Sequence, residues 1–200
     1  MKRSDIEIMA PAGSWEALRA AIRGGADSVY FGVEKMNMRA RSSHNFTAAD
    51  LPEIVGLCRK HGIKSYLTLN IVLYDEETEG MKEIMTAASE AGVTAVIATD
   101  QAAILAAREA GMEVHLSTQL NISNAGTLKF YSQWADVAVL SRELNLQQVR
   151  KIHDSIVTDD IRGPGGELMK LEVFVHGALC MAISGKCYLS LHEYNASANR

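Results

Sequence analysis

The sequence contains little cysteine and little proline, with 3 of each in 200 residues. An odd and low number of cysteines argues against a secreted fold held together by disulfides. No apolar stretch approaches the roughly 18 residues of a membrane-spanning helix, and no long apolar run follows Lys2 and Arg3 as in a signal peptide. A net charge of −4 gives no overall basic surface for nucleic acid. These absences predict a cytoplasmic protein without a membrane span.

What the chain does contain is a repeated pattern of helix, glycine and short apolar strand. Four segments follow it: RGGADSVYFG, KHGIKSYLTLN, EAGVTAVIATD and EAGMEVHLSTQ. Gly25, Gly62, Gly92 and Gly111 each stand where the end of a helix favours a left-handed residue. The runs after them are nearly all apolar, as expected for strands buried on both faces of a parallel sheet.

The pattern predicts strands at 7–9, 28–31, 65–69, 95–98, 114–116, 137–140 and 171–175. It predicts helices after Ser14 and after Thr47, and at 76–90, 101–110, 124–133 and 145–152. In the second helix, Cys58 shares a face with Leu51, Ile54 and Val55, which predicts a buried thiol. Alternating strands and helices indicate right-handed crossovers and a parallel sheet.

Seven strands are one fewer than the eight of a closed TIM barrel, which typically takes about 250 residues. We therefore expect an α/β fold, an incomplete (β/α)8 TIM-like barrel, in a single domain spanning residues 1–200. An open doubly wound sheet is the alternative. No G-x-G-x-x-G follows the first strand, which argues against a dinucleotide-binding version of that alternative.

In such barrels the reactive groups lie at the carboxyl ends of the strands. The expected ends carry Pro11, Gly13, Gly32, Asn70, Asp100, Ser117, Thr118, Gln119, Ser141, Arg142, Glu143, His176 and Gly177. Asn70, Gln119, Arg142, Glu143 and His176 are candidates for substrate binding, with helix capping or a loop hydrogen bond as the alternative for each. Arg142 directly follows the apolar VAVL, and its guanidinium could bind a carboxylate or phosphate through two hydrogen bonds.

The loop after the second strand, VEKMNMRARSSHNFTAAD, is long and carries basic side chains. Long ordered loops in compact domains are often functional. Arg39, Arg41 and His44 are therefore further candidates for binding an anionic ligand, with a solvated loop as the alternative.

Two of the three cysteines, Cys180 and Cys187, lie in the segment EVFVHGALCMAISGKCYLS. Their spacing is wider than the two to four residues usual within a structural zinc pair, so zinc has weak support. A cysteine nucleophile activated by His176 or His192 needs a geometry that a sequence does not give. A purely structural pair remains the third alternative.

The same segment resembles the signature of the collagenase-like peptidases of unassigned catalytic type. The matching positions are Glu172, Phe174, Gly177, Ala178, Leu179, Cys180, Gly185, Cys187, Leu189 and Ser190. The segments MAPAGSWEALRAAIRGGADSVYFG, NMRARSSHNFT and HLSTQLNISN resemble that family as well, so the resemblance runs along essentially the whole chain.

The resemblance implies two kinds of activity. Some members are named for collagenase-like activity without an accepted nucleophile. Others resemble factors for 5-hydroxyuridine formation in tRNA, with prephenate as a proposed anionic co-substrate, or for ubiquinone or 23S rRNA hydroxylation. Relatives hold a [4Fe–4S] cluster on four cysteines, of which two correspond to Cys180 and Cys187.

A four-iron cluster needs four ligands, and Cys58 is predicted to be a core residue and not one of them. The resemblance therefore implies that the other two ligands lie beyond residue 200, in a longer protein of which this is the N-terminal barrel. Ser184 and Ser190 are expected to support or cap the cysteine segment. The sequence favours an iron–sulfur-dependent factor in RNA hydroxylation. The alternatives are a genuine protease, although H-E-x-x-H and G-x-S-x-G are absent, and a non-catalytic scaffold that binds RNA or a partner.

Overall fold

The computed structural model describes residues 5–38, 46–177, 180–195 and 197. The candidates Arg39, Arg41 and His44 lie outside the described residues, as do Ala178 and Leu179 of the signature segment.

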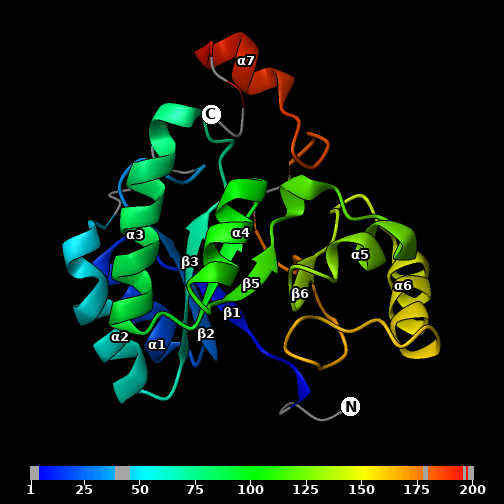
Figure 1. The fold of residues 1–200 in the computed structure, drawn as a ribbon, viewed down its shortest axis with the longest axis horizontal. Helices are drawn as coiled ribbons and strands as arrows, with labels where there is room; N and C mark the ends of the chain where they lie inside the picture. The colour runs from blue at the N-terminus through cyan, green and yellow to red at the C-terminus, as the bar shows by residue number, and fades with distance from the viewer. Residues whose placement is uncertain (1–4, 39–45, 178–179, 196, 198–200) are drawn as a thin grey trace.

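A single parallel sheet of seven strands forms the centre of the fold (Figure 1). The strands are β1 (Met9–Pro11), β2 (Ser28–Gly32), β3 (Lys64–Leu69), β4 (Ala95–Ala98), β5 (Glu113–Leu116), β6 (Val137–Val139) and β7 (Lys170–Glu172). Each strand pairs with the next one in the chain. This sequential order confirms the incomplete (β/α)8 barrel. It also rules out the doubly wound alternative, in which the strand order reverses at a switch point.

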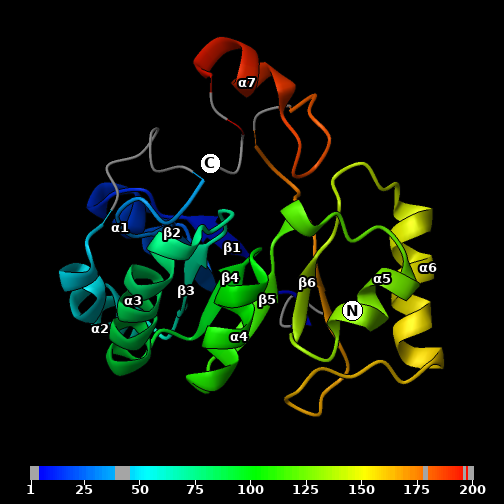
Figure 2. The same ribbon diagram turned by 45° about the horizontal axis from the view of Figure 1, so that its top comes forward.

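Helices alternate with the strands and cover the outside of the sheet (Figures 1 and 2). They are α1 (Trp15–Arg23), α2 (Leu51–Lys60), α3 (Thr78–Ala91), α4 (Gln101–Glu109), α5 (Ala125–Tyr131) and α6 (Leu146–Thr158). A further helix, α7 (Tyr188–Tyr194), lies apart from the sheet in both views. Among the described residues, no helix has both the length and the apolar character needed to cross a membrane.

Local sequence signals explain where these helices begin and end. Ser14, Asp100, Asn124 and Asn145 each accept a hydrogen bond from a backbone N–H of the first turn of the helix that follows. The glycines of the repeat have positive φ angles, for example +80° at Gly92, which confirms the predicted left-handed residues.

The main core lies between the sheet and its helices. Cys58 is 1% exposed there, which confirms the predicted buried thiol, and burial raises its pKa to about 11. A second, smaller cluster fills part of the barrel interior. It consists of Tyr66, Ala95 and Ile97, with Met9 and Tyr30 packed against them.

Several boundaries differ from the prediction, and strand pairing or burial explains the differences in β1, β7 and α6. The first strand lies two residues later than expected, since Met9 pairs with Ser28. The last strand ends at Glu172 because its partner β6 ends at Val139, opposite Glu172. Helix α6 continues to Thr158 because a further apolar residue, Ile156, is buried one turn beyond Ile152.

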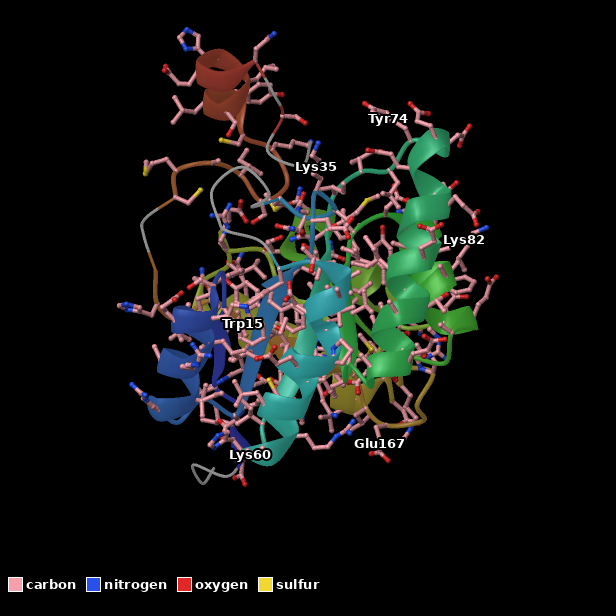
Figure 3. The ribbon with its side chains drawn as sticks, turned by 90° about the vertical axis from the view of Figure 1, so that its left-hand side faces the viewer. Trp15, Lys35, Lys60, Tyr74, Lys82 and Glu167 are labelled. Atoms are coloured by element: carbon pink, nitrogen blue, oxygen red, sulfur yellow. The ribbon has the colours of Figure 1, made fainter. Side chains whose placement is uncertain are left out.

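The two ends of the barrel are clear in Figure 3. Lys35 and Tyr74, which follow β2 and β3, lie at the end that we call the mouth, where the strands finish. Lys60 and Glu167, which precede β3 and β7, lie at the opposite end. Helix α7 lies on the mouth side.

Candidate functional site at the barrel mouth

A cavity of about 320 Å³ opens inside the barrel near the mouth, and we call it the lumen cavity. Its lining residues come from β1 to β7 and the segments that follow them. They are Met9, Pro11, Ala12, Gly13, Tyr30, Phe31, Gly32, Asn37, Met38, Thr68, Asn70, Ile97, Ser117, Thr118, Val139, Glu172 and Phe174. The location matches the end where barrels of this kind bind their ligands.

Asn70 and Gln119, two of the predicted binding residues, hold the rim of the cavity together. The Gln119 Nε2 donates to the Asn70 carbonyl at 2.6 Å, and the Asn70 Oδ1 accepts from the Met38 N–H at 3.1 Å. Gln119 is 8% exposed, and its Oε1 has no hydrogen-bond partner among the described residues. These contacts give both side chains a structural role at the rim.

Position 32, at the end of β2, requires glycine because the Asn37 side chain packs closely against it. A Cβ at Gly32 would lie 2.3 Å from the Asn37 side-chain amide. Asn37 is buried and its Nδ2 donates to the carbonyls of Val33 and Glu34 at 3.5 and 3.4 Å. The glycine therefore lets an amide side chain lie against the cavity wall.

Arg142 and Glu143 hold the segment of residues 180–187, which we call the cysteine loop, through Ser184. The Ser184 N–H and hydroxyl donate to the Glu143 carboxylate at 2.5 and 3.1 Å. The Ser184 Oγ accepts from the Arg142 backbone N–H and Nε at 3.2 and 3.4 Å. The Arg142 Nη2 donates to the Ala182 carbonyl at 3.1 Å. Although partial burial opposes it, the hydrogen bonds from Ser184 hold the pKa of Glu143 below its usual value.

The cysteine loop also touches the wall of the lumen cavity. The Thr118 hydroxyl, which lines the cavity, lies 3.4 Å from the Ser184 Oγ. Gly185 has a φ of +75°, and a Cβ there would lie 2.5 Å from the Gln119 carbonyl oxygen. Only glycine fits this conformation and this approach without strain. The loop is therefore docked on the rim that Gln119 forms.

Both thiols of the cysteine loop have a lowered pKa. Cys180 is exposed, and its hydrogen bond with the Arg142 side chain lowers its pKa. Ser190 contacts the Cys187 Sγ from its backbone N–H at 3.4 Å and from its hydroxyl at 3.2 Å, which lowers the pKa of Cys187. A lowered pKa increases the fraction of thiolate, which is the form that binds metal.

The described residues supply two cysteine ligands and no complete metal site. In the part of the chain that the structure describes, no three cysteine, histidine, aspartate or glutamate side chains come together to hold a metal ion. His176 is exposed, and the His192 ring contacts Glu193 at 3.0 Å. The thiol chemistry fits half of a four-iron cluster, for which two further ligands are needed.

Asp100 has a structural role at the mouth. Its carboxylate accepts from the Ala102 N–H at 2.9 Å and from the Leu73 N–H at 3.1 Å, so it caps α4 and fixes the loop after β3. Ser117 likewise accepts from the Gln119 N–H, at 3.4 Å.

A network of ionisable side chains that was not predicted from the sequence lies deeper inside the barrel. His115 is 4% exposed, with its Nε2 3.3 Å from Glu113 Oε1 and its Nδ1 3.8 Å from Glu172 Oε2. The Tyr66 ring packs on the His115 ring at 4.6 Å, and the Tyr66 hydroxyl donates to Glu7 at 2.5 Å. Burial alone disfavours the charged imidazole, but the hydrogen bond with Glu113 and the nearby carboxylate of Glu172 raise the pKa of His115.

A signal for this network was present in the sequence. In EVHLS, residues 113–117, polar side chains alternate with apolar ones. Alternate residues of a strand point to opposite faces of a sheet. Val114 and Leu116 enter the main core, while His115 and Ser117 face the barrel interior.

Comparisons with known proteins agree with this architecture. The family model described as "Peptidase family U32" matches residues 13–200. The chain belongs to peptidase family U32. A solved structure of a U32 family member, "the U32 Peptidase Mk0906", superposes with a TM-score of 0.62 at 14% identity, covering 74% of this chain and 64% of that one. Tryptophan synthase subunit alpha from Legionella pneumophila superposes with a TM-score of 0.56 at 17% identity, covering 86% and 74%. These likenesses concern the fold alone.

Three U32 relatives carry different names. The chain is 62% identical to "Collagenase" of Porphyromonas gingivalis over 100% of its own length and 48% of that protein. It is 34% identical to "tRNA hydroxylation protein P1" of Bacillus subtilis, over 97% of this chain and 44% of the relative. It is 37% identical to "23S rRNA 5-hydroxycytidine C2501 synthase" of Escherichia coli, over 98% and 28%. The chain thus spans about half or less of the length of these relatives.

Proposed function

We propose that the full-length U32 protein containing this chain is an iron–sulfur-dependent factor for the hydroxylation of a pyrimidine in RNA, such as 5-hydroxyuridine formation in tRNA. The observation that carries the proposal is the position of the cysteine loop. Two thiols of lowered pKa belong to a loop that is docked, through Ser184 and Gly185, on the rim of the lumen cavity. The names of the Bacillus subtilis and Escherichia coli relatives support the same reaction class.

In this proposal Cys180 and Cys187 bind a [4Fe–4S] cluster together with two ligands from outside these 200 residues. When bound, such a cluster supplies one-electron chemistry. Arg142 favours the thiolate of Cys180, and Ser190 favours that of Cys187. A small anionic co-substrate such as prephenate would bind at the mouth, where Arg142 supplies positive charge.

The test is nucleoside mass spectrometry on RNA from a strain that lacks the gene. We expect loss of a hydroxylated pyrimidine, restored by the wild-type gene and by Cys58→Ala, a matched control in the core. Cys180→Ala and Cys187→Ala should fail to restore it, and the full-length protein purified without oxygen should be brown. An unchanged nucleoside profile, or a colourless and iron-free anaerobic protein, would contradict the proposal.

A protease is the second candidate because the Porphyromonas gingivalis relative, at 62% identity, is named "Collagenase". Hydrolysis of gelatin by the purified full-length protein, lost on substitution of one polar residue at the mouth, would favour it. RNA binding that survives removal of the cluster, without any change in modified nucleosides, would favour a scaffold.

A further inference from the structure

The lumen cavity has the size of a site for one small ring. Ligand pockets commonly measure about 300–1,000 Å³, and this cavity of about 320 Å³ lies at the low end of that range. A folded RNA or an extended peptide is too large for this cavity. A single nucleobase or side chain that turns inward from such a polymer is small enough to enter it.

The walls of the cavity suit a planar and largely apolar ligand. Met9, Ile97 and Val139 line it from three strands, and the aromatic residues Tyr30, Phe31 and Phe174 line it as well. Enzymes that act on a nucleobase take it out of the stack and hold it between aromatic or apolar side chains. Stacking on aromatic rings also favours bases over aliphatic groups.

The polar groups of the cavity divide into one carboxylate and several neutral groups. Glu172 comes from β7, and Thr68, Asn70, Ser117 and Thr118 come from the ends of other strands. Among the described lining residues there is no lysine or arginine. The Glu172 carboxylate repels a second anion in the cavity, so the interior suits a neutral ligand.

The network below the cavity reaches Glu172 through His115. The His115 ring lies between Glu113 and Glu172, with one nitrogen facing each carboxylate. Glu113 is itself fixed by the His115 hydrogen bond, which lowers the pKa of Glu113. The His115 Nδ1 approaches the Glu172 Oε2 only to 3.8 Å, so the Glu172 carboxylate can still accept a hydrogen bond from a ligand in the cavity.

We propose that the lumen cavity binds a single pyrimidine base, with the Glu172 carboxylate accepting a hydrogen bond from the N–H edge of the base. Uracil presents one ring N–H between two carbonyl groups, and cytosine presents an amino group, from which glutamate is a known acceptor. The neighbouring amide and hydroxyl groups can donate to the carbonyl oxygens. This inference rests on the proposed function, since it names the group that the same site would receive. An anionic co-substrate then belongs at the rim and not in the interior.

The experiment compares uracil with orotate, which is uracil bearing one additional carboxylate, in binding to the full-length protein purified without oxygen. We expect wild type to bind uracil at least about tenfold more tightly than orotate. Glu172→Gln should weaken uracil binding by about ten- to a hundredfold, as expected for loss of a charge-assisted hydrogen bond. The same variant should bind orotate more tightly than wild type does. An unfolded variant would lose both ligands, so the gain for orotate excludes misfolding. Glu167→Gln, an exposed carboxylate at the opposite end of the barrel (Figure 3), is the matched control and should behave as wild type.

Equal binding of uracil and orotate to wild type would overturn the inference. So would uracil affinity that Glu172→Gln leaves unchanged, or displacement of uracil by a collagen-like peptide that occupies the same cavity. Failure of the inference is distinguishable from failure of the proposed function. Loss of a hydroxylated nucleoside in the deletion strain, without uracil binding, refutes only the cavity assignment. Uracil binding without any change in RNA nucleosides refutes the hydroxylation role and leaves the cavity as a pyrimidine site.

Discussion

Ser184→Ala should release the cysteine loop from the barrel while leaving the barrel folded. Ser184 is fully buried, and its hydroxyl donates to Glu143 at 3.1 Å. The same oxygen accepts from the backbone N–H of Arg142 at 3.2 Å and from its Nε at 3.4 Å. Alanine removes all of these contacts at once and introduces no larger group.

The size of the effect follows from the lost hydrogen bonds. Their partners Arg142 and Glu143 are exposed, so water can replace Ser184, and each lost hydrogen bond costs about 0.5–1.5 kcal/mol. At about 1.4 kcal/mol for each factor of ten, each lost bond should shift the equilibrium between docked and open loop toward the open state by about 2- to 12-fold. The barrel strands do not depend on Ser184, so the global free energy of unfolding should change less than the local one.

The assay is native-state hydrogen exchange of the full-length protein, followed by mass spectrometry of peptides covering residues 180–190. The Ser184 N–H donates to Glu143 and the Lys186 N–H donates to the Ile183 carbonyl, so both amides report loop opening. Ser155→Ala is the control, because its hydroxyl donates to the Lys151 carbonyl on α6, away from the loop. Unchanged exchange in the loop, or equal acceleration in the loop and the strands, would refute the argument that Ser184 docks the loop.

Three further substitutions test other parts of the molecule. Cys58→Ala should leave any cluster intact and lower the free energy of unfolding by about 1–2 kcal/mol, because Cys58 is packed in the core. Iron content and thermal unfolding measure these two effects, and loss of iron would refute the assignment of Cys58 to the core. Arg142→Lys should raise the pKa of Cys180 toward its usual value, since lysine does not reproduce the guanidinium geometry. The pH midpoint of iodoacetamide alkylation in cluster-free protein should move upward, and an unchanged midpoint would show that Arg142 does not lower the pKa of Cys180. His115 has a raised pKa when folded, so its contribution to stability is complete below about pH 6.5 and is lost as pH rises through the raised value. The loss of unfolding free energy in His115→Gln should therefore be larger at acidic than at alkaline pH in urea titrations, and a loss independent of pH would argue against a charged His115.

The fold could be predicted because its signals are local and repeated. Each glycine of the pattern needs a left-handed conformation at a helix end, and Gly25, Gly62, Gly92 and Gly111 all adopt it. The exact ends of the strands could not be predicted, since they depend on where a neighbouring strand stops. β7 ends at Glu172 for that reason, although apolar residues continue to Val175.

The candidate site was predicted in part. The rule that polar groups gather at strand ends located Asn70, Gln119 and Arg142 at the mouth, but it did not give their partners. Arg142 was expected to face a ligand, whereas its described contacts are with the cysteine loop. Contacts of this kind join residues about forty positions apart, and only the tertiary fold brings them together. The assignments of these residues to substrate binding stay predictions.

A continuous set of contacts joins the cysteine loop to the lumen cavity. Ser184 lies against Thr118, and Gly185 lies against the backbone of Gln119. The Gln119 side-chain amide donates a hydrogen bond to the Asn70 carbonyl, and both Thr118 and Asn70 line the cavity. A displacement of the loop therefore changes the rim of the cavity directly, without a long path through the core. Gly185 is the position where this matters most, because any side chain there would push the loop away from Gln119.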